Sequence, residues 1–525
     1  MLVTLLLLLQ LCHGICNVHG STVHANSSDM LSLLDFKKSI TSDPKGALSS
    51  WNTTTHFCLW NGVTCSSKHP WRVMKLDLGS YGLSGSLSPS LGNLTLIEEL
   101  NLSSNALSGQ LPPLNRLHKL KVLHLGNNSL HDMIPITLTN CTSLKILDLS
   151  QNLIYGEVPP QVSLLSDLIV LQLYKNNITG IIPSTISNIT HIEEIHLSYN
   201  QLKGSIPEEL GKLPNVSWMT LGTNNLSGGI PQSILNISSL QTLSFRQNML
   251  GEALPPFCDS LRSLQYLDLS GNLFGGHIPA SLGNISSLTD IDLGSNNFTG
   301  QIPSFWGNLP SLYSISLEAN RLEASQKHSW DLFYSLGNCT LLESILLNSN
   351  QLDTIADSVG NLSVNLQVLG LGENHISGTV PLSIGNLHGL TDLELNKNNF
   401  TGGIEEWVQK LTNLQVLDIG ENNFLEPIPP SIGNLSYLNY LFLSHGTFTG
   451  SIPHNFGYLE QLQLLYLSHN NLNGDIPSSL GNLHQLQKMD LSNNDLGGDI
   501  PSNLGNLGEL QHLFLNNNKF RAIRP

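Results

Sequence analysis

The chain has 525 residues and a formal net charge of −16 at pH 7, and only 12% of its residues are charged. Ordinary soluble domains carry about 25% charged residues, so we expect Asn, Ser, Thr and attached sugar to hydrate this surface. The negative charge argues against nucleic acid or an anionic membrane as a partner, because either would favour clustered Lys and Arg.

The start of the chain predicts export. Residues 2–11 form a short apolar run, and Val23-His24-Ala25 offers small residues for cleavage before Asn26. The run is too short to span a bilayer, so residues 1–25 are interpreted as a secretory signal peptide. The expected location is the secretory pathway and then the apoplast or the cell surface.

Seventeen Asn-x-Ser/Thr sequons follow. Behind a signal peptide they predict heavy N-glycosylation. The predicted sites are Asn26, Asn52, Asn93, Asn101, Asn127, Asn140, Asn177, Asn188, Asn215, Asn225, Asn236, Asn284, Asn297, Asn338, Asn361, Asn399 and Asn434. Asn101 is expected on an exposed strand face, where a glycan would obstruct the surface beside it.

Residues 26–72 predict an N-terminal cap over the open end of a stacked core. A helix is expected to begin at Ser28 and Asp29 and to end at Asp43-Pro44. Its apolar side would include Met30, Leu33, Leu34, Phe36 and Ile40. Cys58 and Cys65 are close together in a segment predicted to be secreted, which favours a disulfide. A metal site is not favoured, since no second Cys/His pair accompanies them.

From residue 73 one pattern recurs, and residues 462–485 show it as L-x-x-L-x-L-x-x-N-x-L-x-G-x-I-P-x-x-L-G-N-L. The Leu465/Leu467 alternation predicts a short strand with one buried face. A buried Asn470 can pair with backbone groups that no sheet partner reaches. One unit cannot bury its own apolar side, so copies must stack. The pattern is that of a leucine-rich repeat of the extracellular plant type.

The repeat occurs 19 times, with nearly every step 24 residues long. Its anchors, here called ladder positions, are Tyr81, Asn105, Asn128, Asn152, Asn176, Asn200, Asn224, Asn248, Asn272, Asn296, Asn320, Asn350, Asn374, Asn398, Asn422, Gly446, Asn470, Asn494 and Asn518. The predicted fold is therefore an α/β solenoid, a plant-type leucine-rich-repeat horseshoe or superhelix with a parallel β-sheet on its concave face. The array is expected to run over residues 73–525, with the last unit uncapped.

Several motifs of the cap and the array resemble those of plant leucine-rich-repeat receptor kinases. They include Leu33-Leu34-Asp35-Phe36-Lys37, Leu48-Ser49-Ser50-Trp51-Asn52, Phe57-Cys58-Leu59-Trp60-Asn61-Gly62-Val63-Thr64-Cys65 and Leu336-Gly337-Asn338-Cys339-Thr340. The last of these, with the insertion at 322–330, resembles the grass branch that includes the rice bacterial-blight resistance receptor and is related to the flagellin receptor. The resemblance implies a receptor of innate immunity or signalling that binds a microbial or endogenous peptide. It also implies a leucine-rich-repeat co-receptor kinase as a second partner.

The chain departs from that family at its C-terminal end. Between the last ladder position and Pro525 there is neither an apolar membrane span nor a set of kinase motifs. The chain itself is therefore expected not to be an enzyme, and to reach a membrane only through a segment missing from it. One alternative is that the full locus encodes a membrane receptor Ser/Thr kinase. Another is a secreted enzyme inhibitor, which the great length and the missing terminal cap disfavour.

No catalytic, cofactor or metal site is predicted. The sequence His191-Ile192-Glu193-Glu194-Ile195-His196 has the wrong order for a zinc motif, and it runs into a strand. Cys141, Cys258 and Cys339 each replace a repeat leucine, so they are interpreted as buried small hydrophobic residues.

Binding is expected on the strand face that packs against nothing, at positions six, four and two before each ladder position. Bulky or charged residues gather there in two regions. The first patch is Tyr174, Lys175, Glu194, His196, Tyr199, Trp218 and Arg246, predicted to bind ligand. The second patch is Tyr440, Phe442, His445, Tyr466, His469, His512 and Phe514, predicted to bind a co-receptor or a second ligand. Between them Asp268, Asp290, Asp292 and Glu318 form an acidic strip that would attract a basic peptide. The alternative is that the aromatic residues pack sideways on their neighbours.

Overall fold

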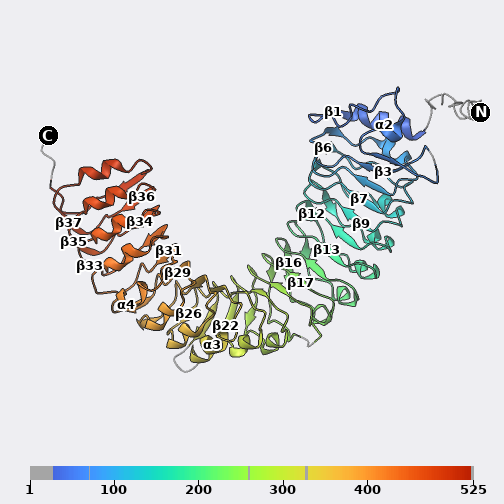
Figure 1. Ribbon diagram of the computed structural model, residues 1–525. Coiled ribbons are helices and arrows are strands. Elements are labelled where there is room, and N and C mark those ends of the chain that lie inside the picture. Colours follow the sequence, from blue (N-terminus) through green and yellow to red (C-terminus); the bar gives the residue numbers. More distant parts are fainter. Residues whose placement is uncertain (1–27, 70, 258–259, 325–328, 522–525) are drawn as a thin grey trace, which may run out of the picture. The chain divides into compact units, whose positions relative to one another are not determined.

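The computed structural model describes residues 28–69, 71–257, 260–324 and 329–521, with only the backbone at 329–331. Figure 1 shows the chain. It divides into two compact units, one up to Val216 and one from Ser217 onward. The predicted signal peptide, Asn26 and Cys258 lie outside the described residues. Within the described part, no helix combines the length and the apolar character needed to cross a membrane.

The first unit stacks coils that each contribute one strand to a main sheet. Its strands are β2 (Val63–Cys65), β3 (Val73–Asp77), β5 (Glu99–Asn101), β7 (Val122–His124), β9 (Ile146–Asp148), β11 (Val170–Gln172) and β13 (Glu194–His196). β2 is antiparallel to β3, and the strands from β3 onward are parallel. The antiparallel β2 therefore closes the first edge of a parallel sheet.

On another side of the same coils lie shorter strands and single turns of 3₁₀ helix. The short strands are β1 (Ile40–Ser42), β4 (Ser84–Ser86), β6 (Ala106–Gly109), β8 (Ser129–Leu130), β10 (Tyr155–Glu157), β12 (Asn177–Thr179) and β14 (Lys203–Gly204). The helices are α2 (Ser28–Ser39), η1 (Phe57–Leu59), η2 (Pro89–Asn93), η3 (Ile136–Asn140), η4 (Pro160–Leu164), η5 (Ser184–Asn188) and η6 (Glu208–Lys212).

The second unit repeats this plan. Its main strands, which pair in parallel, are β15 (Trp218–Thr220), β17 (Thr242–Ser244), β19 (Tyr266–Asp268), β21 (Asp290–Asp292), β23 (Ser314–Ser316), β25 (Ser344–Leu346), β27 (Val368–Gly370), β29 (Asp392–Glu394), β31 (Val416–Asp418), β32 (Tyr440–Phe442), β34 (Leu464–Tyr466), β36 (Lys488–Asp490) and β38 (His512–Phe514). The sheet continues on both sides of Gly446, so the glycine at that ladder position does not end the array.

The remaining elements of the second unit also follow the repeat. The short strands are β16 (Asn225–Gly228), β18 (Met249–Leu250), β20 (Gly275–Gly276), β22 (Asn297–Gln301), β24 (Arg321–Ala324), β26 (Gln351–Leu352), β28 (Ser377–Thr379), β30 (Asn399–Thr401), β33 (Thr449–Gly450), β35 (Asn471–Asp475) and β37 (Asp495–Gly497). The helices are η7 (Ile234–Asn236), η8 (Ala280–Asn284), η9 (Ser304–Asn308), α3 (Ser329–Leu336), η10 (Asp357–Asn361), η11 (Leu382–Asn386), α4 (Glu405–Val408), η12 (Pro430–Asn434), η13 (His454–Tyr458), η14 (Ser478–Asn482) and η15 (Ser502–Asn506).

The ladder asparagines join the coils as their chemistry predicts. Asn470 is buried, and its Nδ2 donates to the carbonyls of Leu443 (2.8 Å), Leu467 (3.1 Å) and Ser468 (3.3 Å). Its Oδ1 accepts from the Phe448 N–H at 3.1 Å. One side chain therefore satisfies backbone groups from neighbouring coils that no strand pairs. Burial of these groups without partners would be costly.

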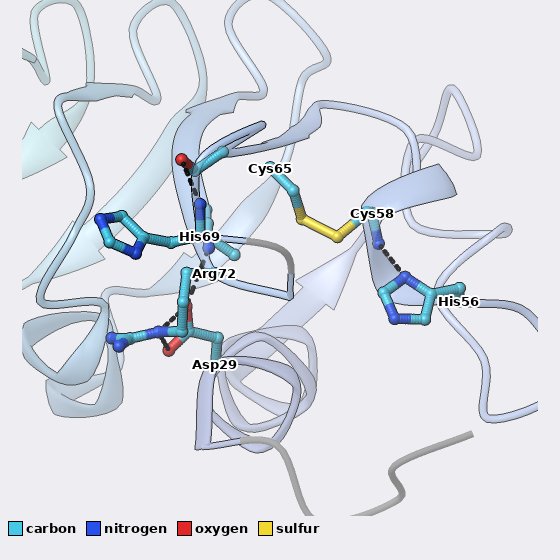
Figure 2. Close-up of a disulfide and its surroundings, with 8 residues drawn as sticks. Asp29, His56, Cys58, Cys65, His69 and Arg72 are labelled. Atoms are coloured by element: carbon cyan, nitrogen blue, oxygen red, sulfur yellow. Dashed lines mark hydrogen bonds and ion pairs between the residues drawn. A yellow bond between two sulfur atoms is a disulfide. The ribbon is translucent and has the colours of Figure 1, made fainter. Parts of the chain in front are cut away.

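The cap is held by a buried ion pair, which Figure 2 shows beside the predicted disulfide. The Asp29 carboxylate accepts from Arg72 Nε (3.1 Å to each oxygen) and from the Val73 N–H (2.8 Å). Cys58 and Cys65 form the disulfide, with their Cα atoms 5.5 Å apart. The Asp29 bonds attach α2 to the start of β3, and the disulfide joins η1 to β2, which pairs with β3.

The predicted helix boundary was wrong at its C-terminal end. α2 ends at Ser39, and Ile40–Ser42 forms β1, which pairs antiparallel with β4. The β-branched residues Ile40 and Thr41 favour this extended conformation. The segment thereby extends the sheet of short strands by one strand at the cap.

Two of the three cysteines predicted to be buried are described, and both are buried and free. The Cys141 thiol lies 3.3 Å from the Leu114 carbonyl, and the Cys339 thiol lies 3.3 Å from the Trp306 carbonyl. Burial raises the pKa of each thiol to about 11, so both stay protonated at neutral pH. They are packing residues rather than reactive ones.

Candidate ligand-binding surface

The outward positions form columns, because equivalent residues of successive coils are register partners. Tyr440 pairs with Leu464, and Phe442 pairs with Tyr466. Neighbouring strands are about 4.8 Å apart, so side chains one repeat apart lie within contact distance. A column of bulky residues therefore makes a continuous surface rather than isolated points.

Six residues of the two patches lie outside the strands. Tyr174 and Arg246 lie two residues after the ends of β11 and β17. Lys175, Tyr199, His445 and His469 each come one residue before a ladder position, in left-handed backbone with φ of 57°, 56°, 55° and 54°. The chain turns there to bury the ladder residue, so these side chains project from a turn beside the sheet. Their assignment to the strand face was therefore wrong, although they border it.

The structure pairs several first-patch residues of the first unit with neighbours. His196 Nε2 lies 3.1 Å from Glu194 Oε2, and the Tyr174 hydroxyl accepts from Gln151 Nε2 at 2.8 Å. Tyr199 is 44% exposed. These contacts fix the side chains in place while leaving the aromatic surface of Tyr199 open to solvent.

The other two residues of the first patch, Trp218 and Arg246, belong to the second unit. Trp218 begins β15 and is 44% exposed. Arg246 Nε lies 4.0 Å from Asp268 Oδ2. Asp268 is buried and also accepts from the Ser270 hydroxyl (2.7 Å). Asp268 is thus buried among polar partners, and it offers little exposed surface to the acidic strip.

The second patch consists of two aromatic groups within the second unit, on β32 with β34 and on β38. Phe442 and Tyr466 have ring centroids 5.2 Å apart, and Tyr440 lies 6.5 Å from Phe442. His512 and Phe514 stack at 6.3 Å. The rings contact one another sideways, as the alternative interpretation required, and several still present a face to solvent.

The imidazoles of His445 and His469 border this surface. Their ring centroids are 4.1 Å apart and their planes lie within 13° of parallel. His469 Nε2 is also 3.0 Å from Asn493 Nδ2. The pair therefore forms a stacked edge along the turn side of the second patch.

Lys488 was missed from the sequence. It lies on β36 between the aromatic residues, with its Nζ 4.8 Å from the Tyr466 ring centroid and 5.4 Å from that of Phe514. A cation over aromatic faces is stabilising, so Lys488 orients both rings. Its position six before Asn494 was the available signal, but only the structure shows that its side chain reaches both rings, since the register partner of Tyr466 and Phe514 on β36 is Asp490.

An acidic pair adjoins the aromatic column and was also missed. Glu394, Asp418 and Phe442 are successive register partners on β29, β31 and β32 (Figure 1). Glu394 Oε2 accepts from Asn348 Nδ2 at 2.8 Å. Burial raises the pKa of Asp418 to about 6; the Gly420 N–H opposes this rise, and the charges of Glu394 and Glu421 add to it. The hydrogen bond from Gly420 therefore does not offset the cost of placing a charged Asp418 carboxylate at this site.

This imbalance predicts a pH-dependent gain from removing the charge. The folded pKa of Asp418 is about 6 against 3.8 for the free group, so the folded state binds its proton more tightly. The carboxyl consequently costs stability as pH rises through this range, and the cost is fully present above about pH 6. Asp418→Asn should raise Tm at about pH 8 by a few degrees and leave it unchanged at about pH 3.5. An equal gain at both pH values would contradict this account; thermal scans with Asp392→Asn as control test it.

The described sequons fall into distinct settings. Asn93, Asn140, Asn188, Asn236, Asn284, Asn361 and Asn434 each end a 3₁₀ helix and are exposed. Asn127, Asn177, Asn215, Asn225, Asn338 and Asn399 are also exposed, and Asn52 and Asn297 are half-buried. Asn101 lies on the main sheet, where its Nδ2 donates to Asp77 (2.9 Å) and its Oδ1 accepts from the Ser103 hydroxyl (2.8 Å). The Asn101 carboxamide, which would carry the glycan, is thus already hydrogen-bonded through both its nitrogen and its oxygen.

Family models for leucine-rich repeats match most of the array. The leucine-rich repeat region model matches residues 80–344, which is half of the chain, and further repeat models match 365–387, 412–472 and 436–496. The leucine rich repeat N-terminal domain matches residues 26–66. The cap and the array therefore both correspond to known modules.

The comparisons with individual proteins lead to plant receptors. The receptor kinase-like protein Xa21 of Oryza sativa subsp. japonica is 49% identical over 84 residues, 15% of this chain and 8% of that protein. The ectodomain of GASSHO1/SCHENGEN3 from Arabidopsis thaliana, solved with CASPARIAN STRIP INTEGRITY FACTOR 2, is 33% identical with a TM-score of 0.85, covering 94% of this chain and 62% of that one. Arabidopsis HAESA, solved with the peptide hormone IDA and the co-receptor SERK1, is 30% identical with a TM-score of 0.71, covering 94% and 90%.

The matched segments span only 8% to 17% of the length of the curated relatives. The family assignment rests on the family models, which match the cap and most of the array. The chain therefore belongs to the leucine-rich-repeat family, and its relatives within that family are the ectodomains of plant receptor kinases.

Proposed function

We propose that this chain is the extracellular recognition region of a plant receptor of innate immunity or signalling, and that it binds a peptide or protein ligand on the face of the main sheet. The second patch carries the proposal. Its aromatic rings lie on strand positions that face away from the core, and Tyr, Trp and Arg most often anchor interfaces. The relatives solved with peptides support the same class of ligand.

The neighbouring charges define the ligand chemistry. Glu394 and Asp418 continue directly into the Phe442 and Tyr466 column. A ligand that follows this column would place a basic group over the carboxylates and an apolar group over the rings. The acidic end would attract a basic peptide and fix its direction.

The proposed partners and location follow from the same relatives. A leucine-rich-repeat co-receptor kinase is the proposed second partner, and the turn side of the second patch, with His445 and His469, is the proposed surface for it. The chain would be secreted and N-glycosylated, and displayed at the plasma membrane as part of a longer receptor kinase. Sequencing of the transcript beyond Pro525 tests that last point.

Peptide selection on the secreted chain tests ligand binding. A displayed library of random peptides should yield ligands that carry Lys or Arg together with apolar residues. Phe442→Ala combined with Tyr466→Ala should weaken their binding by about tenfold or more, as loss of central aromatic anchors does. The control is Tyr437→Ala, an exposed tyrosine outside the main strands. Equal affinity of the selected peptides for the double variant and the wild type would contradict the proposal.

A further inference from the structure

Large apolar side chains are exposed on and beside the short strand β10 of the first unit, away from the main sheet. Met133 is 54% exposed, Leu153 51% and Tyr155 48%. The ligand surface proposed above does not use them. Clustered exposed apolar residues mark a surface that something covers. We call these three residues the flank patch.

The register places a sequon asparagine beside this patch. Met133 is the bridge partner of Tyr155, and Tyr155 is the register partner of Asn177 on β12 (Figure 1). Leu153 lies two residues before Tyr155 and so on the same face. Asn177 is exposed, and Thr179 completes its sequon. The backbone of the sequon asparagine therefore lies one strand spacing, about 4.8 Å, from the Tyr155 backbone.

The flank patch is held in place by the strand beneath it. Gly156 has φ +80°, and a Cβ added there would lie 2.8 Å from Met133 Cγ. The Met133 side chain therefore approaches the β10 backbone at Gly156, the residue after Tyr155. This close approach requires glycine, and it presents the thioether and the ring as one surface.

We propose that an N-linked glycan on Asn177 covers the flank patch, with its first N-acetylglucosamine packed on the Tyr155 ring. The apolar C–H face of a pyranose suits an aromatic ring that has a polar tip. Attachment joins Asn177 Nδ2 to the anomeric carbon of a lipid pyrophosphate-linked oligosaccharide. The lipid pyrophosphate leaves, and the amide nitrogen gives up one proton. The inference rests on the proposed secretion and adds a packing role for one sugar.

The second unit contains a matched control. Asn399 begins β30 one residue after a ladder asparagine, as Asn177 begins β12, and Thr401 completes its sequon. Its register partner is Ser377 in place of Tyr155. Gly378 corresponds to Gly156, and a Cβ added there would meet nothing within 4 Å. The two sequons share a backbone setting and differ in the surface beside them.

The test uses the secreted, glycosylated chain and its variants. Asn177→Gln should lower Tm by about 2 °C and increase the fluorescence of a bound hydrophobic dye, whereas Asn399→Gln should change neither. In a Tyr155→Ser background, Asn177→Gln should have no further effect, because the surface that the sugar covers is gone. Trimming with an endoglycosidase that leaves one sugar should preserve the wild-type Tm, which separates this effect from any defect in folding during export.

Three outcomes would overturn the inference: equal effects of the two glutamine substitutions, additive effects of Asn177→Gln and Tyr155→Ser, or glycopeptides that show Asn399 occupied and Asn177 bare. Each leaves the proposed secretion intact. If mass spectrometry found every sequon unmodified, secretion itself would fail along with the inference.

Discussion

Replacing Asn296 with Ala should lower the free energy of unfolding of the second unit by about 3 kcal/mol. Asn296 is 7% exposed, and its Nδ2 donates to the carbonyls of Leu269 (3.0 Å), Leu293 (3.1 Å) and Gly294 (3.0 Å). Its Oδ1 accepts from the Phe274 N–H at 3.1 Å. The variant loses all four bonds in a dry interior, where unpaired backbone groups are most costly.

The backbone groups that Asn296 bonds are not equally affected by the substitution. The Leu293 carbonyl keeps a bond from Asn320 (3.0 Å), and the Leu269 carbonyl keeps one from Asn272 (3.1 Å). The Phe274 N–H loses the acceptor that the ladder supplies. Its burial without that acceptor is the largest part of the expected cost.

Hydrogen exchange measures the effect where it arises. Since each coil contacts mainly its neighbours, faster exchange is expected over residues 264–298 and little change near β38. Ser295→Ala, which alters the exposed residue beside the ladder position, is the control and should leave exchange nearly unchanged. Protection that is equal in Asn296→Ala and the wild type would show that the ladder bonds contribute no net stability.

The asparagine ladder was predictable because it depends only on the length of the repeat and on the hydrogen-bonding capacity of the side chain. A position that recurs every 24 residues inside an apolar pattern must be buried, and a carboxamide is one of the few side chains that can both donate and accept there. The main strands followed from the same pattern. The assignment of Lys175, Tyr199, His445 and His469 to the strand was wrong. The sequence pattern does not reveal that the residue just before each ladder position adopts a left-handed backbone conformation.

The contacts of the candidate site depend on distances between coils. Lys488 between Tyr466 and Phe514, and Asp418 beside Glu394, are 22 to 26 residues from the groups they contact. Sequence gives the column in which each residue lies. The register and the burial decide whether it is paired, as Asp268 is, or left with a raised pKa, as Asp418 is.

The cap should be even more sensitive to a single substitution than the ladder. Asp29→Ala should cost about 4 kcal/mol, because it leaves the buried Val73 N–H without its acceptor and removes the ion-pair partner of Arg72, whose side chain is 33% exposed. Asp29 is fully buried, and its carboxylate accepts from both Arg72 and the Val73 N–H. Arg72 also donates from Nη2 to the Thr95 hydroxyl at 2.8 Å, which ties α2 through β3 to the next coil. Without Asp29, α2 loses its charged attachment to the array and keeps the hydrogen bonds from Ser90 Oγ to the Ser32 carbonyl and from Ser39 Oγ to the Ser86 carbonyl.

The consequence is local, because α2 and the aromatic residues behind it form the end of the stack. Phe36 and Trp51 lie 6.3 Å apart by ring centroid, and Trp51 stacks on Trp60 at 5.3 Å. Opening of α2 would expose these aromatic residues to water, so the secreted yield should fall. Amide hydrogen exchange over residues 28–39 should approach the rate of a free peptide. Asp35→Ala is the matched control on the same helix, since its pair with Lys38 (3.4 Å) is solvent-exposed and such pairs contribute less than about 1 kcal/mol. A secreted Asp29→Ala chain with a protected α2 would mean that the disulfide and the apolar packing hold the cap without the ion pair.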